Sequence, residues 1–421
     1  MSKIVDLSAD ALGWVDERLP VVKAFKTHMS EYYAPKNFNF WYYFGVLAMV
    51  ALAIQIMSGI WLMMFYTPSI ELAFDSIEYI MRDVPGGWFI RYMHEVGATF
   101  FFLVIYLHIF RALLYGSYQR PRELVWIMGM VIYIALMAEG FFGYVLPWGN
   151  MSFWAAKVII SLVGAVPYIG ESLQIWVQGD FLISDSILHK FFAFHVMLVP
   201  LVIIVVVFVH LVALHQVGSN NPDGVDIKAK KDADGIPLDG IPFHPYYTVH
   251  DLVPMVIFMM LFFAAIFFFP DGWGFFLETP NFIEANILNT PEHITPAWYY
   301  TPFYAMLRGV TIDFFGVSAK FWGLVVMGAG MMILILLPWL DRSPVKSMRY
   351  KGMASKTMLL LFTFSALALG VLGVKPADWA PYWVTPLLTI VYFSYFVFMP
   401  IYTSLEKTKP VPDRVTMGAG H

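Results

Sequence analysis

The sequence predicts an all-α integral membrane protein with eight transmembrane helices and additional amphipathic surface helices. Apolar residues make up 59% of the 421 residues and charged residues only 13%, whereas soluble domains carry about a quarter charged residues. Eight stretches are also long and apolar enough to cross a bilayer, which takes roughly 20 residues. We place the spans near 41–64, 91–115, 124–146, 189–214, 250–270, 318–340, 357–375 and 382–403.

The distribution of positive charge supports this count. Eight spans put both termini on one side of the membrane, and most of the 26 Lys and Arg residues then fall on that side. Because cytoplasmic loops carry the excess of Lys and Arg, we expect both termini in the cytoplasm. The formal net charge of −4 gives no reason to expect a nucleic-acid partner.

The spans divide the chain into five parts. These are a cytoplasmic amphipathic segment (1–40), the first four spans with their outer-face helices (41–219), a polar cytoplasmic loop (220–247), the last four spans with a long outer loop (248–405) and a cytoplasmic tail (406–421).

Two connections on the outer side are long and rich in Pro, Gly and aromatic residues, as functional loops often are. Within the first connection, residues 152–180 are too interrupted to span again, so we expect helices lying flat on the outer face. In the second, we expect Asp271, Glu278 and Glu284 to be surface charges that steer soluble partners by electrostatic attraction.

The chain contains no cysteine. Disulfides, thiolate metal sites, covalent c-type haem attachment and iron–sulfur clusters of the all-cysteine kind are therefore excluded. Any redox cofactor has to rest on His, Met, Tyr or carboxylate ligands.

Two spans carry paired histidines. His94 and His108 are 14 residues apart on the second span, which is about 40° short of four helical turns and roughly 21 Å along the axis. His195 and His210 are 15 residues apart on the fourth span, which runs in the same direction. The rings of each span share a face, so His94 is level with His195 and His108 with His210. Two bis-imidazole haem sites result, with no open coordination position, which suits electron transfer.

The helices between carry glycines at the same interval. Gly45 and Gly59 lie on the first span and Gly129 and Gly143 on the third, each pair 14 residues apart. Glycine permits the close approach that a porphyrin needs. The first four spans are therefore predicted to form a dihaem four-helix bundle.

Three further residues belong to this pattern. Arg91 and Arg111 lie within one turn of a histidine ligand and are expected to meet haem propionates; the alternative is that both are interfacial snorkelling residues. The 15-residue step on the fourth span is irregular, and Pro200 is expected to kink the helix and absorb the extra residue.

Longer motifs resemble the cytochrome b subunit of the ubiquinol–cytochrome c oxidoreductase (the bc1 complex, respiratory complex III) of bacterial type. The resemblance runs from about residue 40 to the last span. Its motifs are RYMH (91–94), GYVLPWGNMSFW (143–154), FFAFH (191–195), GSNNP (218–222), IPFHPYYT (241–248) and TPEHITPAWYYTPFYAMLR (290–308). The photosynthetic relative is split after the fourth span, so the continuous chain favours the respiratory type.

The resemblance implies two haem b groups and ubiquinol or ubiquinone as substrate. It also implies a Rieske iron–sulfur protein and cytochrome c1 as partners, a homodimeric complex, and a multi-pass location in the bacterial inner membrane surrounded by lipid. Quinol is oxidised at an outer site, electrons cross the membrane through the haems, and quinone is reduced at an inner site, which contributes to a proton gradient.

The resemblance also implies site residues. The outer site uses Gly143, Tyr144 and the segment from Pro296 to Tyr299. The inner site uses His215, Ser219 and Asp251, with His250 where the family usually has Lys, and this exchange predicts a different pH response.

One departure affects the outer site. Where the family usually reads Pro-Glu-Trp-Tyr, Ala297 replaces the glutamate that is often assigned the quinol proton. Glu292, Tyr144 and a water chain are the candidates to replace it. Both this change and the 15-residue histidine step resemble variants in some bacterial members.

Two alternatives remain at this stage. A transporter that uses intramembrane histidines as proton relays leaves the glycine pairs unexplained. A dihaem anchor of another quinone oxidoreductase has the haems but should lack the second outer loop and the last four spans.

Overall fold

The computed structural model describes residues 13–416 of the chain. Parts of the expected N-terminal segment and tail, residues 1–12 and 417–421, lie outside the described residues. The described chain is mostly helical, with one short antiparallel pair of strands, β1 (Tyr33–Pro35) and β2 (Gly240–Pro242).

The expected spans are all present. Seven helical stretches are long and apolar enough to cross a membrane: Phe40–Met63 (η2 and α3, Phe44–Met63), α5 (Gly87–Tyr115), α6 (Glu123–Val145), Asp185–Val217 (α9, η3 and α10), Phe243–Phe268 (η4 to α12), Ala319–Leu340 (α14 to α15) and α16 (Met353–Val374). The eighth is a bent pair, α17 (Val384–Val397) and α18 (Met399–Leu405), with an angle of 52° between its halves. Pro400 follows the break, and proline removes a helical hydrogen bond there.

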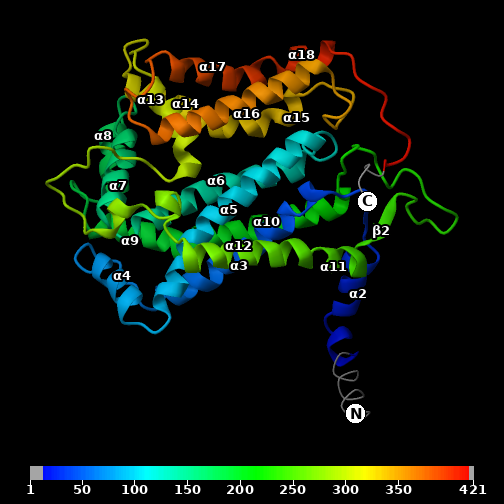
Figure 1. Cartoon of the computed structure of the whole chain (residues 1–421), viewed down its shortest axis with the longest axis horizontal. Helices are drawn as coiled ribbons and strands as arrows, with labels where there is room; N and C mark the ends of the chain where they lie inside the picture. The colour runs from blue at the N-terminus through cyan, green and yellow to red at the C-terminus, as the bar shows by residue number, and fades with distance from the viewer. Residues whose placement is uncertain (1–12, 417–421) are drawn as a thin grey trace.

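The long helices run roughly parallel in two groups (Figure 1). In the first group α3 packs against α5, α6 packs against α10 (Val199–Val217), and α12 (Leu252–Phe268) lies on α5 and α3. In the second group α13 (Thr301–Gly309) and α17 pack against α16, and α14 (Ala319–Met332) packs against α13. Ile203 is the one buried residue described on α10, as expected of an apolar helix whose other faces meet lipid.

The extra residue of the fourth span lies in a π-helical turn next to Pro200. A π-helical turn, η3 (Phe194–Leu198), contains His195 and ends just before Pro200. A π turn inserts one extra residue into an α-helix. The 15-residue step is thus taken up in the turn itself, and the two histidines stay on one face.

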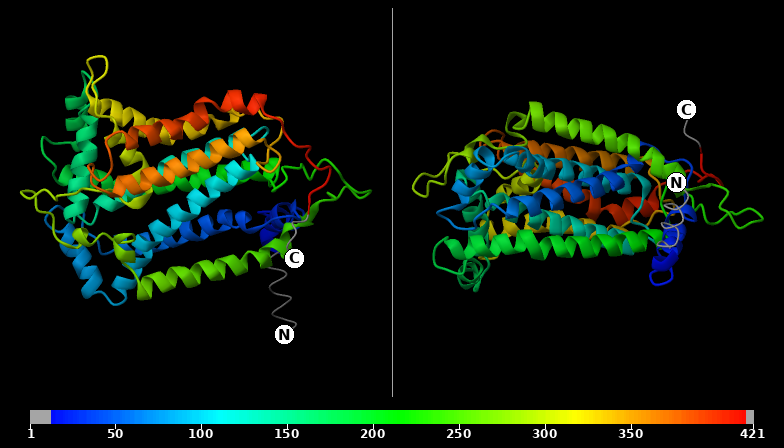
Figure 2. Two further views of the ribbon diagram at one scale, coloured as in Figure 1. Left: turned by 45° about the horizontal axis from the view of Figure 1, so that its top comes forward. Right: turned by 90° about the horizontal axis from the view of Figure 1, so that it is seen from below.

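Surface helices cover one end of the molecule. The helix α4 (Ala73–Arg82), α7 (Asn150–Val163) and α8 (Gly170–Gln178) lie at this end together with the loop between α12 and α13. Figures 1 and 2 show α7 and α8 running across the long helices, as expected for the segment 152–180. The helix α2 (Val21–Phe25), the β1–β2 pair and the tail lie at the opposite end.

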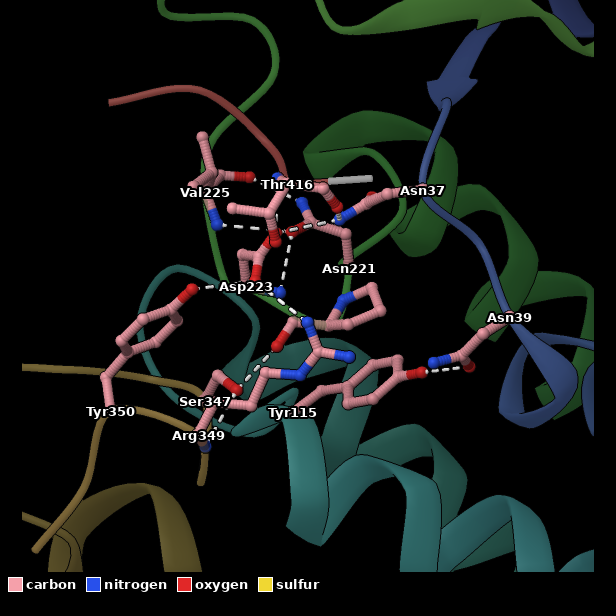
Figure 3. A network of polar contacts seen from close by, with 11 residues as sticks. Asn37, Asn39, Tyr115, Asn221, Asp223, Val225, Ser347, Arg349, Tyr350 and Thr416 are labelled. Carbon is pink, nitrogen blue, oxygen red and sulfur yellow. Dashed lines mark hydrogen bonds and ion pairs between the residues drawn. The ribbon is translucent and has the colours of Figure 1, made fainter. Parts of the chain in front are cut away.

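A buried carboxylate ties the segments at that opposite end together (Figure 3). Asp223 is fully buried and accepts hydrogen bonds from Asn37 Nδ2 at 3.0 Å, Tyr350 Oη at 2.8 Å and Arg349 Nη1 at 3.1 Å. The backbone and hydroxyl of Thr416 donate to it as well, at 2.7 and 2.8 Å. One side chain therefore joins the N-terminal segment, two loops and the tail.

We predict that Asp223→Asn destabilises this end by about 2 kcal/mol, because a charge-assisted network loses its acceptor. Burial alone would raise the pKa of Asp223, but hydrogen bonds from Thr416 and Tyr350 and the charge of Arg349 bring it below its usual value. The stabilisation is thus present above the unfolded pKa of about 4 and lost as pH falls through the lower folded pKa.

Thermal unfolding of the purified protein across pH measures this effect. The melting temperature of Asp223→Asn should lie below that of the parent at neutral pH, and the gap should close in strong acid. The control is Asp234→Asn, since Asp234 is exposed in the same loop. Equal melting temperatures for the two variants at neutral pH would contradict the prediction.

Candidate functional site

The histidines of the outer level face each other across a cavity of about 600 Å³. The ring centroids of His94 and His195 are 5.9 Å apart. A metal held between two imidazoles at about 2 Å from each nitrogen puts the centroids about 6 Å apart. The spacing therefore fits one iron between the rings, and the cavity around them is of the size that cofactor sites have.

Hydrogen bonds at Nδ1 orient the rings of both His94 and His195. Nδ1 of His94 lies 2.9 Å from Ser58 Oγ, whose own hydroxyl donates to the carbonyl of Ile54 at 2.6 Å. Ser58 is therefore the acceptor, and the ring carries its proton on Nδ1. Nδ1 of His195 lies 3.0 Å from a carboxylate oxygen of Glu139 and 3.1 Å from its carbonyl. Such partners fix the tautomer that leaves Nε2 for a metal.

Each of the four expected glycines faces one of the four histidine rings. A Cβ built on the glycine would lie 3.5 Å from His108 at Gly45, 3.1 Å from His94 at Gly59, 3.4 Å from His210 at Gly129, and inside any permissible contact with His195 at Gly143. An added Cβ would press on the imidazole at Gly59 and above all at Gly143, whereas at Gly45 and Gly129 it would make an ordinary van der Waals contact.

The inner level is a second cavity of about 350 Å³, lined by His108 and His210. Among the described residues, Nδ1 of His210 and Nε of Arg111 are buried there without a hydrogen-bond partner, and Arg111 Nη2 lies 3.3 Å from His108 Nδ1. A buried cation without an anion is costly. The unpaired guanidinium therefore fits the expected propionate at this level.

Arg91 is arranged differently from Arg111. It lines the outer cavity, but its guanidinium pairs with Glu95 one turn further along α5 at 2.8 Å. The expected propionate partner thus competes with a carboxylate of the same helix.

The inner cavity continues into a polar lobe. His215, Ser219 and Asp251 all line it, and Oδ1 of Asp251 is buried without a partner. His250 is exposed and stacks on Tyr246 with ring centroids 4.4 Å apart, so it lies outside this lobe. His250 is thus not among the residues that line the cavity, and its part in the inner site stays a prediction.

The N-terminal segment completes this lobe, which the sequence did not predict. Tyr32 Oη is 2.8 Å from Ser219 Oγ. The rings of Tyr32 and His28 pack against His215, with centroids 4.5 and 5.2 Å away. The β1–β2 pairing brings these residues over the end of α10.

The outer cavity also has a polar lobe, on the side of the long loop. Tyr144 and the segment from Pro296 to Tyr299 line it as expected, and Tyr299 stacks on Phe102 with centroids 3.8 Å apart. Glu292 is exposed and does not line the cavity. It is therefore misplaced for the role of proton acceptor that the sequence suggested.

Glu278 corrects a second expectation. It was predicted to be a surface charge, whereas its side chain lines the outer cavity and accepts a hydrogen bond from the hydroxyl of Tyr144. The loop folds inwards here because Asn281 bonds to the backbone and hydroxyl of Ser152 at 2.8 and 2.9 Å. Asp271 and Glu284 are exposed, as expected.

Comparison with known proteins agrees with this geometry. Residues 29–218 match the family model for cytochrome b/b6/petB, and residues 284–393 match that for the C-terminal part, cytochrome b(C-terminal)/b6/petD. Cytochrome b of Allochromatium vinosum is 56% identical over 96% of this chain and 98% of that protein. The chain belongs to the cytochrome b family.

Other relatives extend the match. Cytochrome b of Rhodospirillum rubrum is 45% identical over 96% of both chains. A chain of a hyperthermophilic respiratory complex III superposes with a TM-score of 0.85 at 37% identity, covering 94% of this chain and 99% of that one. Membership in cytochrome b implies haem b binding and a place in a multi-subunit, bc1-type complex III within the membrane. The match across both halves excludes the transporter and the shorter dihaem anchor.

Two half-buried carboxylates near the paired histidines were missed by the sequence analysis. Glu95 and Glu139 both lie within spans and line the outer cavity. The rule that ionisable groups inside a membrane are functional by default had been applied only to the histidines. Applied to carboxylates, it would have found both.

We predict that Gly143→Ala lowers the occupancy of the outer haem by about half or more, because the added methyl occupies the place of the His195 ring. Alanine favours the helix by up to about 1 kcal/mol, so a loss cannot come from helix propensity. Haem content per chain and the reduced-minus-oxidised spectrum measure the effect. The control is Gly328→Ala on α14, where a Cβ meets nothing within 4 Å; equal haem content in the two variants would refute the steric argument.

Proposed function

We propose that this chain is the dihaem subunit of a quinol–cytochrome c reductase, which oxidises ubiquinol at the outer cavity, reduces quinone at the inner cavity and works only within the assembled complex. The observation that carries the proposal is the repeated pattern of a histidine pair, a glycine pair and a polar lobe in each of two cavities. When bound, two non-covalent bis-histidine haem b groups would supply one-electron carriers at the two levels.

The separation of the two levels suits transfer across a bilayer. The 14-residue step between His94 and His108 corresponds to about 21 Å along the helix, against a hydrocarbon core of about 30 Å. The bundle holds both ligand pairs on rigid helices, so little reorganisation accompanies a change of charge.

The outer lobe is arranged to hold a quinol ring and take its protons. Tyr299 and Phe102 form a stacked aromatic wall, and Tyr144 presents a hydroxyl to the same space. We assign the binding role to the segment from Pro296 to Tyr299 and a hydrogen-bonding role to Tyr144. The apolar lining excludes water from the reacting oxygen.

The inner lobe is arranged to bind a quinone and deliver protons to it. His215 and Ser219 are placed to donate hydrogen bonds to its carbonyl oxygens, and the unpaired oxygen of Asp251 is placed to hold a proton. The opening lies at the end that holds the positively charged loops, which we assign to the cytoplasm. Protons are then taken up inside and released outside.

The partners follow from the outer surface. The helices α7 and α8 and the loop between α12 and α13 form the face on which we place the Rieske iron–sulfur protein and cytochrome c1. The exposed Asp271 and Glu284 contribute negative charge there. We further propose a homodimeric complex in a bacterial inner membrane, both termini cytoplasmic, and the five-part division of the chain given by the spans.

We predict that His94→Ala and His195→Ala each reduce haem b from two groups to one per chain. The outer haem needs both imidazoles as axial ligands to be six-coordinate, and each variant removes one of them. The remaining haem should be the inner one in both variants. Quantification of haem per chain and a potentiometric titration of the membrane protein measure this. His293→Ala, on the outer loop, is the control; two full haem equivalents in either ligand variant would rule out the pairing.

A further inference from the structure

The outer cavity needs a proton acceptor that its binding segment does not provide. Position 297 holds alanine, and Ala297 itself lines the cavity. Three carboxylates line the cavity elsewhere: Glu95, Glu139 and Glu278. Their contacts decide which of them is available.

Two of the three are already engaged beside the haem ligands. Glu139 contacts Nδ1 of His195, and Glu95 forms an ion pair with Arg91 at 2.8 Å. Each therefore serves a neighbouring group. Glu278 forms no ion pair with Lys, Arg or His in the described chain, and its bonded partner is the hydroxyl of Tyr144.

We propose that Glu278 is the base that accepts a proton from quinol in the outer cavity, with Tyr144 hydrogen-bonded to it as the relay. The proposal rests on the proposed quinol oxidation at this site and adds the identity of its proton acceptor. Glu278 thus supplies, from a different part of the loop, the carboxylate that is missing at position 297, where this chain has alanine.

The surrounding contacts hold Glu278 in place. It immediately precedes η6 (Thr279–Phe282), and Asn281 within η6 bonds to Ser152. The hydroxyl of Ser152 in turn donates to the carbonyl of Tyr144 at 2.6 Å. The base and its relay are therefore fixed to one another by a second set of hydrogen bonds, as a catalytic pair requires.

The electrostatic environment matches the role. The pKa of Glu278 is raised to about 7, mainly by burial; the hydrogen bond from Tyr144 opposes this rise and the charge of Glu95 adds to it. The titratable groups that face it are Tyr144 on α6, Glu95 on α5 and Tyr299 on η7 (Trp298–Tyr300), and Arg91 lines the same cavity in its pair with Glu95. A general base works best when its pKa is near the operating pH.

The step balances as follows. Quinol loses two electrons, one to the iron–sulfur partner and one to the b haem, and two protons, becoming quinone. One O–H bond of the quinol breaks as Tyr144 takes that proton and passes its own to the carboxylate of Glu278. Glu278 then releases it to water at the outer face, and the second proton leaves on the side of the iron–sulfur partner.

The test uses the assembled complex in membranes with the inner site blocked by an inhibitor, and it follows quinol-driven reduction of haem b across pH. For Glu278→Gln we expect the rate to fall about 100-fold, the scale of a lost general base, with KM changed little. The parent rate should rise with pH around 7, and the variant should lose this dependence. Glu284→Gln, an exposed carboxylate of the same loop, should behave as the parent.

Two further variants separate chemistry from structure. Glu278→Asp should recover part of the rate, and Ala297→Glu in the Glu278→Gln background should restore both rate and pH dependence by returning a carboxylate to the cavity. Unchanged haem spectra confirm assembly in each. A parent-like rate and pH profile in Glu278→Gln would overturn the assignment, and so would failure of both rescues. Absence of quinol oxidation in the parent complex would instead overturn the proposed function.

Discussion

The contact between four imidazole rings and four glycines is the constraint on which this structure depends. His94 and His108 of α5 and His195 and His210 of the η3–α10 helix each face a glycine of α3 or α6, so a shift in the register of these helices would break the four contacts. In lipid there is no hydrophobic force between helices to favour that arrangement, and close packing at small residues has to supply it. The same contacts leave two cavities between the helices, and the polar lobes of these cavities extend to opposite ends of the bundle.

The two polar lobes are built from the same kinds of side chain. Each ends in a carboxylate in contact with the cavity, Asp251 at one end and Glu278 at the other, and each has a tyrosine nearby. The loop that carries Glu278 is held by buried hydrogen bonds between Asn281 and Ser152, and Asp223 ties together the segments at the opposite end. The rigid helices hold the paired histidines that we assign to the haems. The hydrogen-bonded outer loop holds Glu278, which we assign to proton exchange.

The bundle and the level pairing of its histidines could be predicted from the sequence because a membrane helix has a known period and a known length. His94 and His108 share a face for that reason alone, and the glycines repeat the interval. The π turn at His195 was not predictable, since a 15-residue step is compatible with a kink as well. Pro200 lacks a backbone N–H, and the sequence does not show whether the helix adjusts to that missing hydrogen bond by a kink or by a π turn.

Loops have no such period, and the errors of prediction are concentrated there. Glu278 reaches Tyr144 across 134 residues, and no local pattern distinguishes it from the exposed Glu284 or Glu292. Tyr32 and His28 enter the inner lobe only because β1 pairs with β2, again a contact between distant segments. Glu95 and Glu139, by contrast, lie on predicted spans and were within reach of the rule on intramembrane charges.

The most direct test of the account is the haem content and ligation of the unmodified protein. Haem extraction with quantification per chain, combined with exposure of the reduced protein to carbon monoxide, addresses both levels at once. The account predicts two b haems per chain in six-coordinate form, neither of which binds carbon monoxide. One haem per chain, or a haem with an open position, would contradict the two-level pairing of the histidines.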